Sequence, residues 1–431
     1  MKTYQKTACI IFLLLFFLYA PFAIHFANAS SISELKSEID DRSTKIQELE
    51  KEISGYQKMI ETIGKEKDTL QNAIQILEIS GKKLLVDMKI TEKKISLTDS
   101  NIGKLSVEIS DKKQQIIQNN KALSESIRRM YEFDSTSLIE IVVGYEKMSD
   151  FWNIIENLEK FQSSIQDNLN ELRVLKEEYT NKKLSEEQKR RELANLKSQL
   201  ADQKKIVDYN KAEQFNLLKE TKNKESNYRN MVAEKLRLKE QFEKELLNLE
   251  SELRITIDPN SIPRARAGVL NWPLDNIFVT QYFGDTEFSK TTTAYNGNGH
   301  NGIDFRASVG TKIKASLGGV IVGTGNTDES RGCYSYGKWI LIKHENGLST
   351  LYAHLSLIKV NAGETVNTGD IIGYSGNTGY STGPHLHLTV YATQGVKIVR
   401  LGDIKKITNC SNVKMPVAPL NAYLNPLDYL Q

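Results

Sequence analysis

The sequence predicts a multidomain α + β protein, in which a long helical coiled-coil hairpin precedes a mainly antiparallel β domain. From Ser31 to about Ile257 there is no proline, and Lys, Glu, Leu, Ile, Gln and Asn dominate. Beyond about residue 269, glycine and β-branched residues take over. The 431 residues are enough for two or three domains. The net charge of +3 is small for this length, so the composition does not indicate a nucleic-acid partner.

Apolar residues recur with heptad spacing through the first part of the helical segment. The a positions include Ile32, Ile39, Ile46, Ile53, Ile60, Ile74, Met88, Ile95, Ile102, Ile109 and Ile116. The d positions include Leu35, Leu49, Tyr56, Ile63, Leu70, Leu77, Leu84 and Leu105. A period of 3.5 sustained over this length is typical of a coiled coil. Lys67 and Gly81 occupy a positions and are local weak points.

The heptad is interrupted near residues 131–150. Residues 137–144 are short, apolar and β-branched, and residues 148–151 offer a helix start with an acidic residue in its first turn. A new apolar stripe follows through Phe151, Ile154, Leu158, Phe161, Ile165, Leu172, Leu175, Leu193, Leu196 and Leu200. We therefore expect a coiled coil over residues 30–257 that turns back on itself as an antiparallel hairpin. An arm of roughly a hundred residues would extend on the order of 150 Å. The alternative is a parallel homodimer with a kink.

Two prolines end the helical segment, because Pro259 and Pro263 cannot continue a helix. Residues 258–271 are expected to form a linker with a basic stretch. Residues 272–431 then form the β domain, in which Asn-Gly and Gly-Asn pairs separate short strands. Asn346-Gly347, between two apolar β-branched runs, is a clear hairpin signal.

The N-terminus has the pattern of a signal peptide over residues 1–29. Lys2 and Lys6 precede an apolar run from residue 8 to residue 20, and Ala27-Asn28-Ala29 offers a cleavage site before Ser30. The alternative is an uncleaved membrane anchor, since the apolar stretch with its flanks approaches membrane-spanning length. In both interpretations the chain is exported across the cytoplasmic membrane, and most of it lies in a periplasmic or extracellular compartment.

Cysteine usage agrees with export. Cys9 would leave with the leader, and Cys333 and Cys410 would remain as an even pair in an oxidising compartment. We expect a Cys333–Cys410 disulfide; the alternative is two unpaired thiols.

The histidines carry the functional signal. His385 and His387 alternate on an expected strand, so both imidazoles lie on one face. His300 and Asp304 are four residues apart and share a face of an extended segment. His354 can reach the same cavity from a third strand. A catalytic zinc site takes three imidazole or carboxylate ligands and keeps one position for water. Two further histidines beside that water suit proton transfer.

Each motif alone has a plainer interpretation. A lone H-x-x-x-D pair is usually a solvated turn, and alternating histidines also occur as ordinary strand residues. The conjunction of both motifs with His354 in one domain favours a metal site. His344 is interpreted as a hairpin-turn residue and is assigned no role.

In this order and context, the motifs resemble the active site of the LytM/lysostaphin-type zinc metallopeptidases, which are murein endopeptidases. The resemblance covers about the last third of the chain and extends to Trp272-Pro273, Tyr282-Phe283-Gly284, residues 318–322, 337–342, 363–366, 369–373, 375–379 and Asn425-Pro426-Leu427. It implies that His300, Asp304 and His387 are Zn²⁺ ligands and that His354 and His385 are the catalytic histidines.

Two features depart from the family's pattern. Leu388 stands where the family usually has an aromatic residue, and the segment between Tyr391 and Asn425 is unusually long. Both leave the substrate preference open, and neither affects the expected metal site.

The resemblance implies a secreted zinc metallo-endopeptidase that hydrolyses stem or cross-bridge peptides of peptidoglycan, in cell-wall remodelling or cell separation. The long coil is similar to those of EnvC-type and PcsB/CwlO-type wall-hydrolase proteins. It suggests either an FtsEX-like membrane complex as partner or self-association. The alternative function is a non-catalytic coiled-coil activator of a separate wall amidase, although such relatives typically have degraded metal motifs. A purely structural coil protein would leave the C-terminal motifs unexplained.

Overall fold

The computed structural model describes residues 32–64, 69–134, 148–252, 264–284, 299–381, 383–404 and 409–431. The expected signal peptide, residues 1–29, lies outside the described residues and stays a prediction. Within these described ranges, no helix combines the length and hydropathy needed to cross a membrane. The chain divides into two compact units, one of residues 1–42 and 97–190 and one of residues 43–96 and 191–431.

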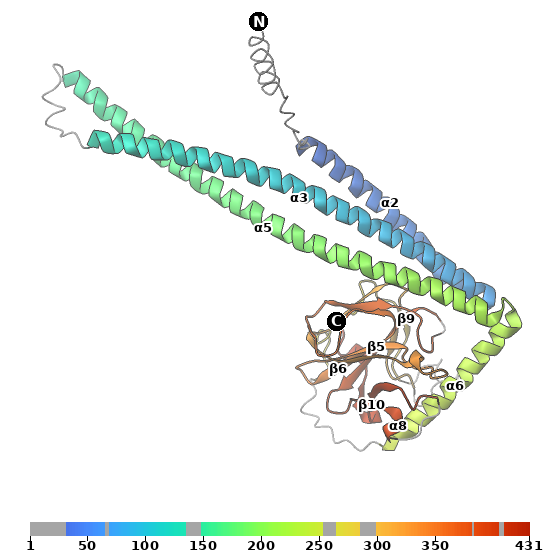
Figure 1. Cartoon of the computed structure of the whole chain (residues 1–431). Coiled ribbons are helices and arrows are strands. Elements are labelled where there is room, and N and C mark those ends of the chain that lie inside the picture. The colour runs from blue at the N-terminus through green and yellow to red at the C-terminus, as the bar shows by residue number, and fades with distance from the viewer. Residues whose placement is uncertain are drawn as a thin grey trace, which may run out of the picture. The chain divides into compact units, whose positions relative to one another are not determined.

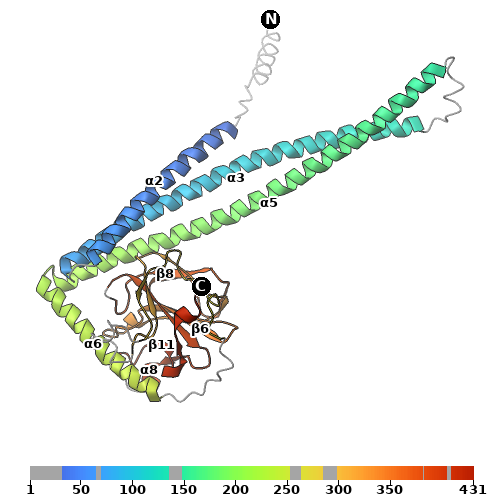
Figure 2. The ribbon, with the colours of Figure 1, turned by 180° about the vertical axis from the view of Figure 1, so that it is seen from behind.

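Among the described residues, four long helices precede the β domain: α2 (Ile32–Gly64), α3 (Leu70–Asp134), α5 (Met148–Thr221) and α6 (Glu225–Glu252). The predicted break near residues 131–150 falls between α3 and α5, and α5 begins at the helix start read from the sequence. The apolar segment at residues 137–144 lies outside the described residues. Figures 1 and 2 show α3 and α5 running side by side over most of their length.

The contacts between α3 and α5 establish that the two helices are antiparallel. In the first unit, Lys182 pairs with Glu108 at 2.7 Å, and Lys112 pairs with Glu178 at 2.6 Å, so later residues of one helix meet earlier residues of the other. An apolar cluster that includes Leu123, Ile165 and Leu172 lies between them. Exposed ion pairs of this kind contribute little, so the apolar seam provides most of the stabilisation.

The helical region reverses once more than the sequence suggested. The expected arm of about a hundred residues is wrong, because α2 ends at Gly64 and α3 begins only at Leu70. In the second unit, Lys94 of α3 lies 3.4 Å from Glu50 of α2, so α2 folds back along α3. The last residue of α2 is Gly64, and glycine is the residue at which helices most commonly end.

A further break separates α5 from α6. Lys222 and Asn223 have φ values of 50° and 54°, in the left-handed region where helices commonly end. In the second unit, α6 packs on the β domain, where Phe242, Leu246 and Leu249 are buried in one cluster with Trp339. The helix therefore covers the β domain. Figure 1 shows α6 alongside it.

The β domain is mainly antiparallel, as predicted. Its elements are β1 (Val279–Gln281), β2 (Ile303–Arg306), β3 (Lys312–Lys314), β4 (Gly319–Asn326), η3 (Thr327–Glu329), β5 (Lys338–Lys343), β6 (Leu348–Ile358), β7 (Thr365–Val366), β8 (Ile371–Ser375), β9 (His385–Ala392), β10 (Lys397–Arg400), α8 (Leu401–Ile404), β11 (Lys414–Val417), η4 (Leu420–Ala422), β12 (Tyr423–Leu424) and η5 (Pro426–Asp428). The main sheet has the order β1-β2-β9-β6-β5-β4-β7, with β12 beside β9 and β8 joining β3 to β6. Strands β10 and β11 form a separate pair.

Both faces of the main sheet are covered. Along the central strand β6, Leu348, Tyr352 and Leu355 belong to one buried cluster, whereas Leu351 and Ala353 belong to another. The second cluster includes residues of β11 and α6, so the long segment after Tyr391 folds over that face. Strands β6 and β9 are thereby held between two apolar layers, and their positions are well fixed.

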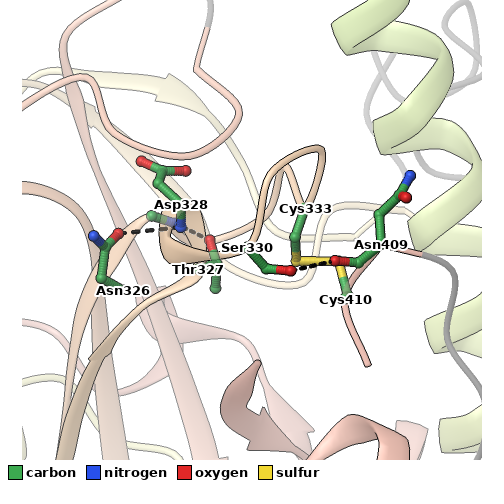
Figure 3. The surroundings of a disulfide bond; sticks show 8 residues. Asn326, Thr327, Asp328, Ser330, Cys333, Asn409 and Cys410 are labelled. Carbon is green, nitrogen blue, oxygen red and sulfur yellow. Dashed lines mark hydrogen bonds between the residues drawn. A yellow bond between two sulfur atoms is a disulfide. The ribbon is translucent and has the colours of Figure 1, made fainter. Parts of the chain in front are cut away.

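In the structure Cys333 and Cys410 form a disulfide between segments 77 residues apart (Figure 3). Beside it, the Ser330 hydroxyl donates a hydrogen bond to the Asn409 carbonyl oxygen at 2.6 Å. The bridge ties the segment that carries β10 and β11 to the loop before β5.

Replacing both cysteines with alanine should lower the free energy of unfolding by roughly 4 kcal/mol, because closure of a loop of this length restricts the unfolded chain. Chemical denaturation of the oxidised wild-type and double-variant chains measures the difference. Under reducing conditions the two proteins should differ far less. An equal difference with and without reductant would assign the loss to packing of the sulfur atoms.

Candidate metal centre

Two neighbouring strands place a carboxylate opposite an imidazole. Asp304 of β2 and His387 of β9 are directly opposed in the antiparallel register, and opposed residues point to the same face of a sheet. His300 lies just before β2, where its backbone pairs with that of Gly284. All three side chains are buried, with exposed fractions between 3% and 9%.

One nitrogen from each imidazole converges with the carboxylate. His387 Nδ1 lies 2.9 Å from Asp304 Oδ1, and His300 Nε2 lies 3.1 Å from His387 Nδ1. His300 Nε2 is also 3.4 Å from Asp304 Oδ1. Ligand atoms of the three residues all lie within 4.8 Å of one another, which is the arrangement of a metal site.

The outer nitrogens of these imidazoles have their own partners. His300 Nδ1 is 3.1 Å from the Tyr282 carbonyl oxygen, which can only accept, so Nδ1 carries the hydrogen and Nε2 has the lone pair. His387 Nε2 is 2.9 Å from the Thr389 hydroxyl. With that hydroxyl accepting, three lone-pair atoms meet with no hydrogen between them. A cation resolves this repulsion, and the donor set of two imidazoles and one carboxylate fits Zn²⁺.

The other two predicted histidines lie beside this trio. His385 Nε2 is 3.8 Å from Asp304 Oδ1, and its Nδ1 lies 2.8 Å from the Gly383 carbonyl oxygen. His354 Nδ1 is 2.8 Å from the Thr378 carbonyl oxygen. The two rings are 4.6 Å apart between centroids. In each case a main-chain carbonyl accepts from Nδ1, which leaves the Nε2 lone pair for chemistry.

His354 reaches this face through a distortion of β6. In the register of β6 with β9, Ala353 is opposite His387, so strict alternation would turn the next side chain to the far face. Instead, His354 adopts φ of 59°, and the pairing of β6 with β5 shifts at this point. A non-glycine residue in this region stores strain, of order 1 kcal/mol or more, and such strain concentrates at functional sites.

The surroundings set charge states that suit metal binding. Burial acts to raise the pKa of Asp304, but the neighbouring His385 and His300 outweigh it and hold that pKa well below its usual range. Burial lowers the pKa of His354, well below its ordinary value, and also that of His387. An ionised carboxylate and neutral imidazoles are the forms that bind metals.

Sequence reasoning missed three residues of the site. Thr389, which fixes His387, lies two residues further along the same strand, so its alternation was available as a signal. Tyr336 and Asn301 gave no signal: the Tyr336 ring lies 5.8 Å from that of His387, and Asn301 Nδ2 donates to the Tyr336 hydroxyl at 3.1 Å. His344 is buried and bonded to Gly318 and Thr350, outside the site.

Comparison with known proteins bears on this part of the chain. Residues 298–399 match the sequence pattern of Peptidase family M23. The chain is 47% identical over 88 residues to the DD-carboxypeptidase/endopeptidase Mpg of Neisseria meningitidis, and 46% identical over 88 residues to the peptidoglycan DD-endopeptidase ShyA of Vibrio cholerae. Each match covers 20% of this chain and 19% of the relative. Lysostaphin of Staphylococcus simulans is 44% identical over 93 residues, 21% of this chain and 18% of the relative.

The matched region thus spans about a fifth of the length of these relatives. Among solved structures, the catalytic domain of lysostaphin from Staphylococcus simulans covers 36% of this chain and 91% of its own, with 28% identity and a TM-score of 0.26.

Thr389→Val should weaken Zn²⁺ binding by about 10- to 100-fold, the range for groups that orient a ligand from outside the coordination shell. Valine keeps the shape of threonine and removes the hydroxyl that meets His387 Nε2. Thr389→Ser retains a hydroxyl and should bind as the wild type does. Competition with a chromophoric chelator measures the affinity. Wild-type affinity in the valine variant would show that Thr389 does not set the tautomer of His387.

Proposed function

We propose, from the peptidase family M23 domain formed by residues 298–399, that this chain is a zinc metallo-endopeptidase that hydrolyses stem or cross-bridge peptides of peptidoglycan. The observation that carries the proposal is the convergence of His300, Asp304 and His387, with His354 and His385 on the same face. The printed names of the relatives, a peptidoglycan DD-endopeptidase among them, support the substrate class.

The chain's own groups divide into two roles. His300 Nε2, Asp304 Oδ1 and His387 Nδ1 would hold the ion. When bound, Zn²⁺ polarises a scissile carbonyl and lowers the pKa of a water molecule. His385 and His354 have Nδ1 fixed on main-chain carbonyls, so each presents Nε2 to the substrate. One Nε2 can take a proton from the attacking water and pass it to the leaving amine, while the other, when protonated, donates to the developing oxyanion.

An activator without catalysis would need none of this arrangement. It could keep the fold and lose the donors, yet all five side chains are present, and one ring nitrogen of each of the four histidines lies within hydrogen-bond distance of a group outside the metal trio. The strain at His354 points the same way, because an inert binding surface has no use for it. These features favour the enzyme over the activator.

We further propose that the protein is exported and acts in wall remodelling or cell separation. The leader pattern of residues 1–29 and the Cys333–Cys410 bridge support export, because disulfides persist in oxidising compartments. A mature N-terminus at Ser30 would support cleavage, whereas a chain that retains Met1 would support the anchor.

The helical region is proposed to bind a partner, either a membrane complex of the FtsEX type or a second copy. Large apolar side chains remain exposed on its helices, among them Trp152 at 61% and Ile117 at 50%. A partner that covers these side chains would remove their apolar surface from water, which favours association. Sedimentation of the full chain decides on self-association, because a strict monomer at high concentration excludes it.

Two measurements on single variants distinguish the metal-binding histidines from the catalytic ones. His387→Ala should lose stoichiometric Zn²⁺ and all hydrolysis of purified wall, since one ligand of three is removed. His354→Ala and His385→Ala should keep Zn²⁺ and lose turnover by about 100-fold or more, the usual contribution of a general acid or base. Metal analysis and release of soluble wall fragments provide the two readouts.

Circular dichroism of each variant controls for folding. A His387→Ala protein with full zinc and full activity would refute the ligand assignment. A folded but metal-free His385→Ala protein would move that residue into the coordination shell.

A further inference from the structure

A buried chain of polar side chains leads away from the metal centre toward α6. It begins at Tyr336, whose ring lies 5.8 Å from the His387 ring at an angle of 33°. Its hydroxyl accepts a hydrogen bond from Asn301, the residue that follows His300. Tyr336 therefore contacts the ring of one imidazole ligand and the backbone neighbour of the other.

Two more tyrosines continue the chain to a carboxylate. The hydroxyls of Tyr336 and Tyr391 are 3.4 Å apart. Tyr391 is directly opposite Tyr423 in the register of β9 with β12, and the centroids of their rings are 4.9 Å apart. Tyr423 then donates to Glu250 Oε1 at 2.6 Å, and the same oxygen accepts from the Ala418 amide at 3.3 Å. Glu250 is only 5% exposed and belongs to α6. We call the set of Asn301, Tyr336, Tyr391, Tyr423 and Glu250 the tyrosine relay.

The direction of the relay depends on the charge of Glu250, because burial raises the pKa of this carboxyl to about 7. When Glu250 is ionised it can only accept, and the Asn301 amide nitrogen can only donate, so each hydroxyl between them can accept from the metal side and donate toward α6. Burial raises the pKa of Tyr336 to about 12 and those of the other two tyrosines well above their ordinary value, so all three remain neutral links. Without the carboxylate, a buried hydroxyl at the end of the chain loses its acceptor, and such unpaired groups are costly.

The relay has no part in the proposed chemistry. The Tyr336 hydroxyl is directed to Asn301 and Tyr391, and the remaining members lie further from the imidazoles. Glu250 and Tyr423 also fall outside residues 298–399, so the end of the relay is supplied by parts of the chain beyond the matched domain.

We propose that Glu250 is a positioning residue for the metal centre: through Tyr423, Tyr391 and Tyr336 it fixes the orientation of Asn301, His300 and His387. The inference rests on the proposed zinc site. It makes α6 part of the support of the active site, because the carboxylate reaches the relay only while Phe242, Leu246 and Leu249 keep this helix packed on the β domain. Displacement of α6 would therefore loosen the metal ligands.

The test compares variants of the full chain that differ at one link. Glu250→Leu removes the acceptor, whereas Glu250→Gln keeps an oxygen at Oε1. Tyr423→Phe removes one hydroxyl and keeps the ring, which preserves a test if the leucine variant fails to fold. Tyr374→Phe is the matched control, because it removes a buried hydroxyl that bonds Asp202 and has no place in the relay.

Zn²⁺ affinity and the visible spectrum of the Co²⁺-substituted protein are the readouts, together with kcat and KM on wall peptides. Glu250→Leu and Tyr423→Phe should weaken Zn²⁺ binding by about 10-fold, the lower end of the range for groups that orient ligands, and should alter the cobalt spectrum. Turnover should fall through kcat more than through KM. Glu250→Gln and Tyr374→Phe should match the wild type in affinity and spectrum.

Wild-type affinity and an unchanged cobalt spectrum in both Glu250→Leu and Tyr423→Phe would overturn the proposal. So would an equal loss in the tyrosine control, which would indicate general destabilisation. The proposed function is contradicted by the wild-type chain alone, if that chain binds zinc and hydrolyses no wall peptide. The relay is judged by metal binding across the variants, so the two failures are distinguishable.

Discussion

The register between β2 and β9 is the constraint on which the metal centre depends. Asp304 and His387 face one another only because Ile303 is opposite Leu388, and both of these apolar residues are fully buried on the other face of the sheet. A slip of one residue would turn the polar pair into the apolar layer on the other face and turn the apolar pair toward the metal centre. Hydrophobic burial thus fixes the relative positions of Asp304 and His387, two of the three groups that would hold a cation. The stability of the sheet offsets the cost of holding them together.

Period-two alternation accounts for most of the site that could be predicted from sequence. It placed His385 and His387 on one face of a strand. Asp304 joins them if its own strand lies next to that strand. His354 is different, because alternation from Ala353 puts its side chain on the wrong face; the irregular pairing with β5 and the left-handed backbone correct this. Such a local distortion depends on tertiary packing. The sequence therefore predicted that His354 belongs to the site, and it did not predict the backbone conformation that brings the side chain there. Tyr336 could not be predicted for the same reason, because it lies in the loop before β5.

In the helical region, heptad spacing predicted some features and missed others. Heptad spacing predicted the seam of α3 and α5, and the change of character near residue 131 predicted the turn between them. The breaks at Gly64 and at Lys222 were missed, because the apolar stripe continues on both sides of each break. On α6, Phe242, Leu246 and Leu249 follow the same spacing of three and four residues as a coiled-coil seam. Periodicity establishes that a helix has an apolar face and leaves open what covers that face.

The cover of α6 is the β domain, and this changes where the catalytic module begins. A fragment that starts at residue 269 would lose the helix that packs against Trp339, and it would leave the tyrosine relay without its carboxylate. Slower hydrolysis by such a fragment would then reflect a loosened metal centre, even if the helical arms normally restrain the enzyme. A fragment that starts at Glu225 keeps α6 and its carboxylate and removes the longer helices. Those helices also pack on the β domain, because Leu84 of α3 and Ile206 of α5 are buried in one cluster with Val309 and Tyr374. Residues 43–96 and 191–431 accordingly form one compact unit, so the support of the enzyme extends beyond the domain that the sequence placed at residues 272–431.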